Sequence, residues 1–115
     1  MRSVTVRLPN AHIAIIDLRK LREYSLNPDH PRGGHKSRVF ASAVGLTAEH
    51  AELLREKVLQ AAIDHEAVET GRDEYGTHYV VDFELKGPSR SAMVRSCWLV
   101  EHAVEAPRLT SCFVL

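Results

Sequence analysis

Cysteine and long apolar runs are both scarce in this 115-residue chain. It has only two cysteines and no Cys-x₂-Cys or His-x₃-His spacing, so no zinc site is expected. No apolar run approaches the ~20 residues that a membrane-spanning helix needs, and the N-terminal residues lack the apolar stretch of a secretory signal. We therefore expect a cytoplasmic protein with no metal, no cofactor and no membrane contact.

The net charge of the chain is zero, but charges of one sign are concentrated in parts of the sequence. Fifteen Lys and Arg balance fifteen Asp and Glu, which argues against a generally basic nucleic-acid-binding protein. Residues 1–38 hold eight basic and three acidic side chains, residues 49–84 hold three and ten, and residues 85–115 hold four and two. A polyanion could therefore be attracted to the N-terminal third, while the acidic middle faces solvent or a basic partner. The ordinary alternative is solvated charge on helix faces.

The order of the periodic segments predicts an α+β fold in a single domain, residues 1–115. Apolar residues at helical spacing predict a short helix after the N-cap Asp17, a second from Gly34 to Val44, and a third after Thr47. After the third helix the period changes to two. Turn residues then delimit four strands, at about 66–71, 77–85, 90–101 and 108–114. We expect the N-terminal helices to pack on a four-stranded antiparallel sheet.

Alternation gives the sheet one apolar and one polar face, with hairpins assumed about Gly87-Pro88 and Val104-Glu105. The face expected under the helices carries Tyr79, Val81, Phe83, Leu85, Ala92, Val94, Trp98, Val100, Leu109 and Phe113. The face expected to be open carries His78, Asp82, Glu84, Met93, Arg95, Cys97, Leu99, Arg108, Thr110 and Cys112. The third helix is expected to bury Leu53, Leu54, Val58, Leu59, Ala62 and Ile63.

This register brings the two cysteines, Cys97 and Cys112, nearly opposite each other. A cross-strand disulfide is then geometrically conceivable. Because cytosolic thiols are normally kept reduced, we expect two free cysteines.

The loop before the second helix is the first candidate for an anion site. Gly33-Gly34 opens that helix, so unpaired backbone N–H groups and the positive end of the helix dipole are expected there. Arg32, Lys36 and Arg38 lie alongside, and His30 and His35 flank the pair. The earlier glycine and preceding strand of a P-loop are missing, which argues against a Walker-type NTPase. The ordinary alternative is a glycine-rich helix start with solvated side chains.

Histidines beside clustered cations can cleave RNA without a metal. A base deprotonates the 2′ hydroxyl, cations stabilise the transition state, and an acid protonates the leaving 5′ oxygen. The open face of the sheet offers a second group, with Arg95 near Thr110 and His78 and with Asp82 one step away; Arg95 and Thr110 could hold a phosphate. Ordinary cross-strand pairs are the alternative for this group. The two groups meet only if the His35 loop reaches round an edge of the sheet.

Several motifs in the chain resemble an uncharacterised bacterial domain family. They are Leu8-Pro9-Asn10, Lys20-Leu21 with Tyr24, Leu26-Asn27-Pro28, the run from His30 to Phe40 with Gly45, Asp73-Glu74-Tyr75-Gly76, Val81-Asp82, Val94-Arg95, Trp98 and Pro107-Arg108-Leu109-Thr110. That family is similar to C-terminal nuclease domains of contact-dependent-inhibition and other polymorphic bacterial toxins. These domains belong to the barnase–EndoU–colicin–RelE group of metal-independent ribonucleases, which place helices ahead of a four-stranded sheet.

The resemblance implies catalytic roles for His35, Lys36, Arg38, Arg95 and Thr110. We expect His30, Arg32 and His78 to contact the substrate, and Trp98 to be a packing or substrate-proximal residue. The implied partners are RNA, tRNA included, and a small cognate antitoxin or immunity protein. The zero net charge departs from the basic character of many such toxins. A non-catalytic module that binds RNA or a protein through the same basic loop is therefore the alternative, and an interaction protein that uses its acidic segment, residues 49–84, is a third reading.

Overall fold

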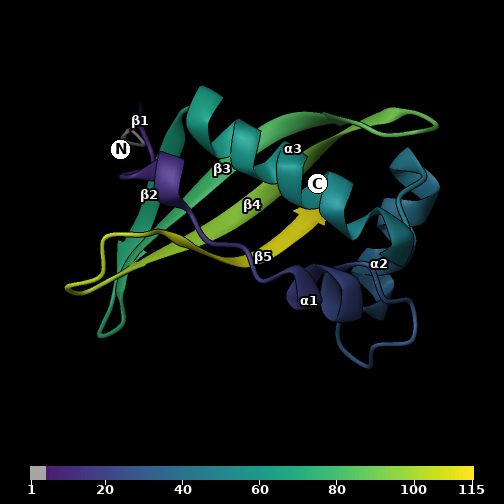
Figure 1. Ribbon diagram of the computed structural model, residues 1–115, viewed down its shortest axis with the longest axis horizontal. Helices are drawn as coiled ribbons and strands as arrows, with labels where there is room; N and C mark the ends of the chain where they lie inside the picture. Colours follow the sequence, from purple (N-terminus) through teal and green to yellow (C-terminus); the bar gives the residue numbers. More distant parts are fainter. Residues whose placement is uncertain (1–4) are drawn as a thin grey trace.

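The computed structural model describes residues 5–115 and has the α+β architecture expected from the sequence (Figure 1). The helical elements are the 3₁₀ turn η1 (Ala11–Ile13), α1 (Leu18–Lys20), the π-helical turn η2 (Leu21–Ser25), α2 (Gly34–Val44), the 3₁₀ turn η3 (Ala48–His50) and α3 (Ala51–Asp64). The strands are β1 (Thr5–Val6), β2 (Ala67–Arg72), β3 (Gly76–Lys86), β4 (Ser91–Glu101) and β5 (Arg108–Val114). No helix in this part of the chain is long and apolar enough to cross a lipid bilayer.

The strands form one antiparallel sheet in the order β1-β2-β3-β4-β5. The four predicted strands are confirmed as β2 to β5, and their ends differ from the prediction by at most one residue. The two-residue strand β1 was not predicted, because so short a segment cannot show a period of two. β3 and β4 pair along their whole length, from Gly76 opposite Glu101 to Lys86 opposite Ser91.

Local capping explains where the helical segments begin. The Oδ1 atom of Asp17 accepts a hydrogen bond from the N–H of Arg19 at 2.9 Å, which confirms the predicted N-cap. Thr47 precedes η3 and α3, which follow each other without a break. Its backbone N–H donates to Nδ1 of His50 at 3.0 Å and closes a capping box.

Helix α3 lies across one face of the sheet and forms a wall of the core (Figure 1). Its buried residues are Ala51, Leu54, Val58, Ala61 and Ala62. The sheet contributes the buried side chains of Val81, Phe83, Leu85, Val94, Trp98 and Leu109. The predicted helix stripe is wrong at Ile63, which is 46% exposed, while Leu53 and Leu59 are only partly buried. The buried stripe is narrower than predicted and is completed by small alanines, so Ile63 falls beside it.

A β-bulge reverses the faces along most of β5. The register between β4 and β5 shifts between Cys97 and Trp98, so Thr110 has no partner on β4. Leu109 lies in the core, as predicted, and its partner on β4 is Trp98. Beyond the bulge the predictions are wrong: Phe113 lies opposite Arg95 on the open face, and Cys112 is buried on the helix side. One extra residue is enough to invert the alternation.

The two cysteines therefore point to opposite faces of the sheet. Cys97 lies opposite Ser111, and Cys112 lies opposite Ser96. The predicted juxtaposition of Cys97 with Cys112 is wrong, and both thiols are free. Because side chains on opposite faces point apart, this backbone cannot accommodate the disulfide.

The N-terminal segment crosses the molecule from one edge of the sheet to the other (Figure 1). At one edge, β1 pairs with the start of β2. At the other edge, Ile15 forms a parallel bridge with Arg108 of β5. The N–H of Ile15 donates to the carbonyl of Pro107 at 2.8 Å, and its carbonyl accepts from the N–H of Leu109 at 3.0 Å. Leu8, between these two contacts, is buried.

Candidate functional site

The polar side chains on the sheet face turned away from α3 form the candidate site. Cross-strand register arranges this open face in rows. The first row joins His78, Leu99 and Arg108, the second Val80, Cys97 and Ser111, and the third Asp82, Arg95 and Phe113. The first row lies near the turns that end β2 and β4, and the third lies near α2. Different chemistry is found at these two ends.

Two histidines form hydrogen bonds with Asp73 at the end of the open face that carries the His78 row. Nε2 of His78 lies 2.7 Å from Oδ2 of Asp73, and Nε2 of His102 lies 3.2 Å from its main-chain oxygen. Carboxylate and carbonyl oxygens only accept hydrogen bonds, so both rings donate from Nε2 and keep Nδ1 as the acceptor nitrogen when neutral. We refer to Asp73, Tyr75, His78 and His102 as the Asp73 corner.

Two neighbouring turns hold this corner in place. Oδ1 of Asp73 accepts from the N–H of Tyr75 at 2.9 Å and from that of Gly76 at 3.2 Å. The N–H of His102 donates to the carbonyl of Tyr75 at 3.3 Å, which joins the β4–β5 turn to the β2–β3 turn. Ala103, the next residue, has a left-handed φ of 61°, an unfavourable conformation for alanine that surrounding contacts must maintain.

The backbone at Gly76 can be formed only by glycine. Its φ is 153°, and a Cβ atom there would collide with the carbonyl of Val100. This close approach lets the turn after β2 lie against the end of β4.

The charge state of Asp73 follows from these bonds. The hydrogen bond from His78 is the largest cause, and that from the N–H of Tyr75 the next, of a pKa for Asp73 below its ordinary value of 3.8. Asp73 is therefore a carboxylate at neutral pH, placed to stabilise an imidazolium on His78.

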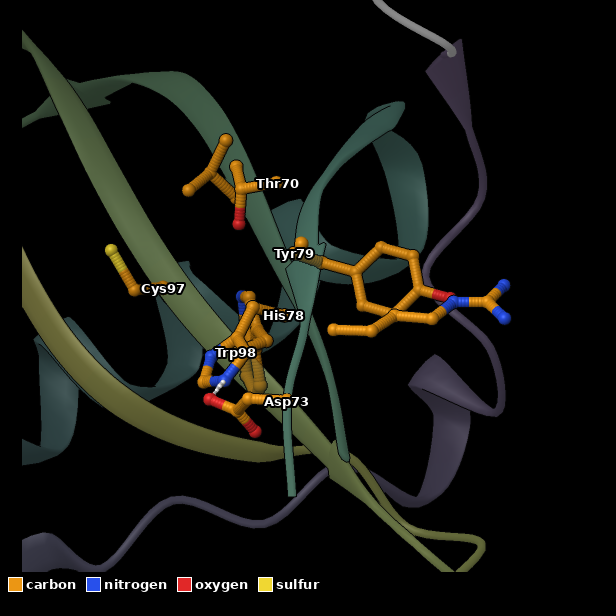
Figure 2. Close-up of a pocket in the computed structure, with 9 residues that line it drawn as sticks. Thr70, Asp73, His78, Tyr79, Cys97 and Trp98 are labelled. Atoms are coloured by element: carbon orange, nitrogen blue, oxygen red, sulfur yellow. Dashed lines mark hydrogen bonds and ion pairs between the residues drawn. The ribbon is translucent and has the colours of Figure 1, made fainter. Parts of the chain in front are cut away.

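A shallow pocket of about 330 Å³ lies beside His78 (Figure 2). Thr70, Val80 and Cys97 line it together with the Asp73–His78 pair. Figure 2 shows His78 and Cys97 on one side of the strands and Tyr79 pointing to the other. Its volume is at the lower end of the roughly 300–1,000 Å³ typical of small-ligand sites.

Arg95, predicted to act with Thr110, is paired with Asp82 instead. Its Nε and Nη2 atoms donate to the two carboxylate oxygens of Asp82, each at 2.8 Å. The hydrogen bonds to Asp82 raise the pKa of Arg95, and the carboxylate neutralises the charge of the guanidinium. The hydroxyl of Thr110 donates to the carbonyl of Cys97 at 3.1 Å. The structure therefore does not bring Arg95 and Thr110 together as one phosphate clamp.

Lys36 does reach the open face, round the β5 edge. Its Nζ atom lies 4.4 Å from the ring centroid of Phe113, within cation–π distance. Phe113 lies opposite Arg95, so Lys36 reaches the row of the open face that carries Arg95. Lys20, from α1, donates from Nζ to the carbonyl of Thr110 at 3.3 Å. Two lysines from different helices thus lie along β5.

His30 takes up the N–H groups of the predicted anion site. Its Nδ1 atom accepts from the N–H of Arg32 and of Gly33, both at 3.0 Å. Its carbonyl accepts from the N–H of Gly34 at 2.9 Å, and its ring packs against Tyr24 with centroids 4.4 Å apart. The expectation of unpaired N–H groups at Gly33-Gly34 is therefore wrong, because a histidine in the loop serves as a cap.

The remaining predicted residues do not gather at one place. His35, Arg32 and Arg38 are exposed. Arg38 is two positions after Lys36, which is about 200° around an α-helix, and it lines a different hollow with Leu26 and Glu49. The side chain of Trp98 is fully buried, so it has the packing role.

A family model described as Domain of unknown function (DUF6883) matches residues 7–115. The chain belongs to this family. Neither the curated proteins nor the solved structures gave a match. The matched residues of this DUF6883 domain include the whole Asp73 corner and both lysines beside β5.

Sequence reasoning found His78 but missed the rest of the Asp73 corner. A local signal was present, because Asp73 and Gly76 are typical first and last residues of a β-turn. His102 has no such signal. Its position beside Asp73 depends on which two turns of the DUF6883 domain lie side by side, and this follows only from the register of the whole sheet.

Proposed function

We propose that this DUF6883 domain is a small metal-independent ribonuclease-like domain, acting as the toxin of a bacterial toxin–antitoxin or toxin–immunity pair. The Asp73 corner is its catalytic centre. The observation that carries the proposal is the attachment of two histidine rings, His78 and His102, to the single residue Asp73. RNA cleavage without a metal requires a base and an acid on either side of one phosphate, and histidine fills both roles near neutral pH.

In this mechanism His78 is the base. Its Nε2 is held by Asp73, so Nδ1 takes the proton from the 2′ hydroxyl of RNA. The 2′ oxygen attacks phosphorus and forms a 2′,3′-cyclic phosphate, while the bond to the 5′ oxygen breaks. His102, in its protonated form, gives a proton to that leaving oxygen. Asp73 stabilises the imidazolium formed on His78.

Arg108 and Tyr75 support an RNA substrate at this corner. Arg108 is in the same row as His78 with Leu99 between them, so the outer two Cα atoms are roughly 10 Å apart. The side chains of His78 and Arg108 can converge on one phosphate above Leu99. In the free protein the guanidinium of Arg108 is paired with Glu101, and it turns to the phosphate when the substrate binds. Tyr75 is 65% exposed and offers an aromatic face on which a base can stack.

The proposal moves the acid–base chemistry from His35 to His78. His35 lies on α2, the helix that packs at the β5 edge, whereas His78 and His102 are joined through Asp73. The sequence-based roles of Lys36 and Arg38 in the chemical step are not part of this mechanism. A small cognate inhibitor remains the expected protein partner, with the Asp73 corner as the surface that it covers.

Cleavage of total bacterial RNA in EDTA, with products resolved on a denaturing gel, tests the proposal. His78→Ala and His102→Ala should each slow cleavage about 10²- to 10⁴-fold. The matched controls are His12→Ala and His35→Ala, since both histidines are exposed and outside the corner. Circular dichroism and thermal melting verify that each variant is folded.

The possible results separate the proposal from its rivals. Loss of cleavage in His35→Ala with full activity in His78→Ala overturns the assignment of the Asp73 corner. A folded wild-type protein that binds RNA but does not cut it, with or without divalent metal, points to the non-catalytic binding module.

A further inference from the structure

Two lysines at the edge of β5 carry positive charge that no acidic side chain among residues 5–115 pairs with. On the open face, His78 pairs with Asp73, Arg95 with Asp82, and Arg108 with Glu101. In contrast, no carboxylate among residues 5–115 lies within ion-pair distance of the ammonium group of Lys20 or Lys36. Both lysines are exposed. Their charge is therefore available to an external anion.

Each lysine is held at a fixed point of β5. Lys20 donates to the carbonyl of Thr110 at 3.3 Å, and the ammonium of Lys36 lies 4.4 Å above the ring of Phe113. Lysine side chains are flexible, so these contacts reduce the entropy lost when the ammonium groups bind a ligand. Asp17 and Glu23 line the hollow beside Lys20, but Asp17 is engaged by Arg19.

The two lysines continue a line that begins at the Asp73 corner. β5 starts at Arg108, which is in the row of His78. Thr110 and Phe113 follow on the same strand, three residues apart and therefore roughly 10 Å. Figure 1 shows α1 and α2, the helices that supply Lys20 and Lys36, at the same side of β5. Positive groups thus recur along one strand, from Arg108 past Lys20 to Lys36.

We propose that Arg108, Lys20 and Lys36 form a track along β5 for the phosphates of a single-stranded RNA, whose scissile bond lies at the Asp73 corner. This inference rests on the proposed function and adds the substrate class and the path of the RNA strand over the domain. Several cations along one line fit a flexible single strand, which can follow a β-strand edge. A rigid duplex presents its phosphates on a curved surface and meets fewer of them. A base beside the Asp73 corner can stack on Tyr75, whose side chain is exposed.

The track is tested by binding, with a probe that cannot be cleaved. The probe is a fluorescent 2′-O-methyl RNA single strand of about 12 nucleotides, which lacks the attacking hydroxyl. Its affinity is measured by anisotropy for wild type, Lys20→Gln, Lys36→Gln and the double variant over a range of salt concentrations. The matched control is Lys57→Gln, because Lys57 is an exposed lysine of α3 on the helix side of the sheet.

Each lysine removed should weaken binding about fivefold near 0.1 M salt and lower the salt slope by about 0.7. Lys57→Gln should change neither quantity. Unchanged binding in the double variant overturns the track, as does equal affinity for a duplex of the same length. If the lysine dependence is found but an ordinary RNA strand is not cut, the track holds and the catalytic proposal fails. If ordinary RNA is cut and the lysine substitutions do not change binding, the catalytic proposal holds and the track fails.

Discussion

The indole N–H of Trp98 donates to the hydroxyl of Ser96 at 2.9 Å, two residues away on the same face of β4. That hydroxyl in turn donates to the carbonyl of Val81 on β3 at 2.9 Å. Both side chains are fully buried. One serine thus satisfies the polar atom of the largest core residue and links it to the neighbouring strand.

Ser96→Ala should lower the free energy of unfolding by about 1–3 kcal/mol, because it leaves the indole N–H of Trp98 buried without an acceptor. Urea unfolding monitored by tryptophan fluorescence measures this loss. Ser111→Ala is the control, since Ser111 lies on the open face of β5 and should change stability by less than about 0.5 kcal/mol. Equal effects of the two substitutions would contradict the role of Ser96.

The bidentate pair of Arg95 with Asp82 should contribute modestly to stability. The side chains of Arg95 and Asp82 are 38% and 34% exposed, so solvent screens the attraction between their charges. A double-mutant cycle with Arg95→Met and Asp82→Ala should give a coupling energy of about 0.5–1 kcal/mol, decreasing with salt. A coupling energy near zero at low salt would show that the two side chains separate in solution.

The Asp73 corner should show acid sensitivity of a defined sign. The hydrogen bonds from His78 and the N–H of Tyr75 lower the pKa of Asp73 below 3.8, so its contribution to stability is complete above that pH. It is lost as the pH falls through the lowered folded-state pKa. Wild type should be more stable than Asp73→Asn at pH 5, and the difference should shrink toward pH 2.5.

NMR titration of the Asp73 carboxyl carbon measures the same property directly. The midpoint should lie below 3.8. A midpoint at or above that value, or a stability difference from Asp73→Asn that does not change with pH, would contradict the bonding described here.

The two cysteines should differ in reactivity although both are free. Cys112 is buried, and burial raises the pKa of its thiol above the ordinary range, whereas Cys97 is half-buried in the pocket beside His78. Ellman's reagent should label one thiol in the native protein and both after denaturation. Cys97→Ser should abolish native labelling. Equal native rates for the two thiols would contradict the faces assigned by the bulge.

Much of the fold was predictable because its signals are local. Asp17 as a cap, Thr47 at the start of the third helical segment, and alternation along β3 and β4 all depend on residues close in sequence. The assignment of β5 side chains to the two faces of the sheet was right only before the bulge. The bulge at Thr110 leaves no mark in the apolar pattern, and the residues after it point to the faces opposite to those predicted.

The candidate site was less predictable because it depends on tertiary placement. His30 was expected to contact substrate, yet its Nδ1 accepts two N–H groups of its own loop, a role set by the loop conformation. His102 meets Asp73 only because two turns at the same end of the sheet lie side by side. Whether the basic loop meets the Arg95 group was left open, because a meeting required the loop to reach round an edge of the sheet. The structure shows that Lys36 does reach round β5, to the ring of Phe113 opposite Arg95.

The N-terminal segment, which touches both β2 and β5, also affects how molecules meet one another. Exposed strand edges are templates for pairing with a second chain, and β2 and β5 are the outermost long strands of this sheet. Both are partly blocked by the same stretch, through β1 at one side and Ile15 at the other. A proteolytic cut after Ile16 that released this segment would expose the edges of both β2 and β5 to pairing with another chain. Resistance of the domain to edge-to-edge aggregation therefore depends on residues that contribute no group to the proposed chemistry.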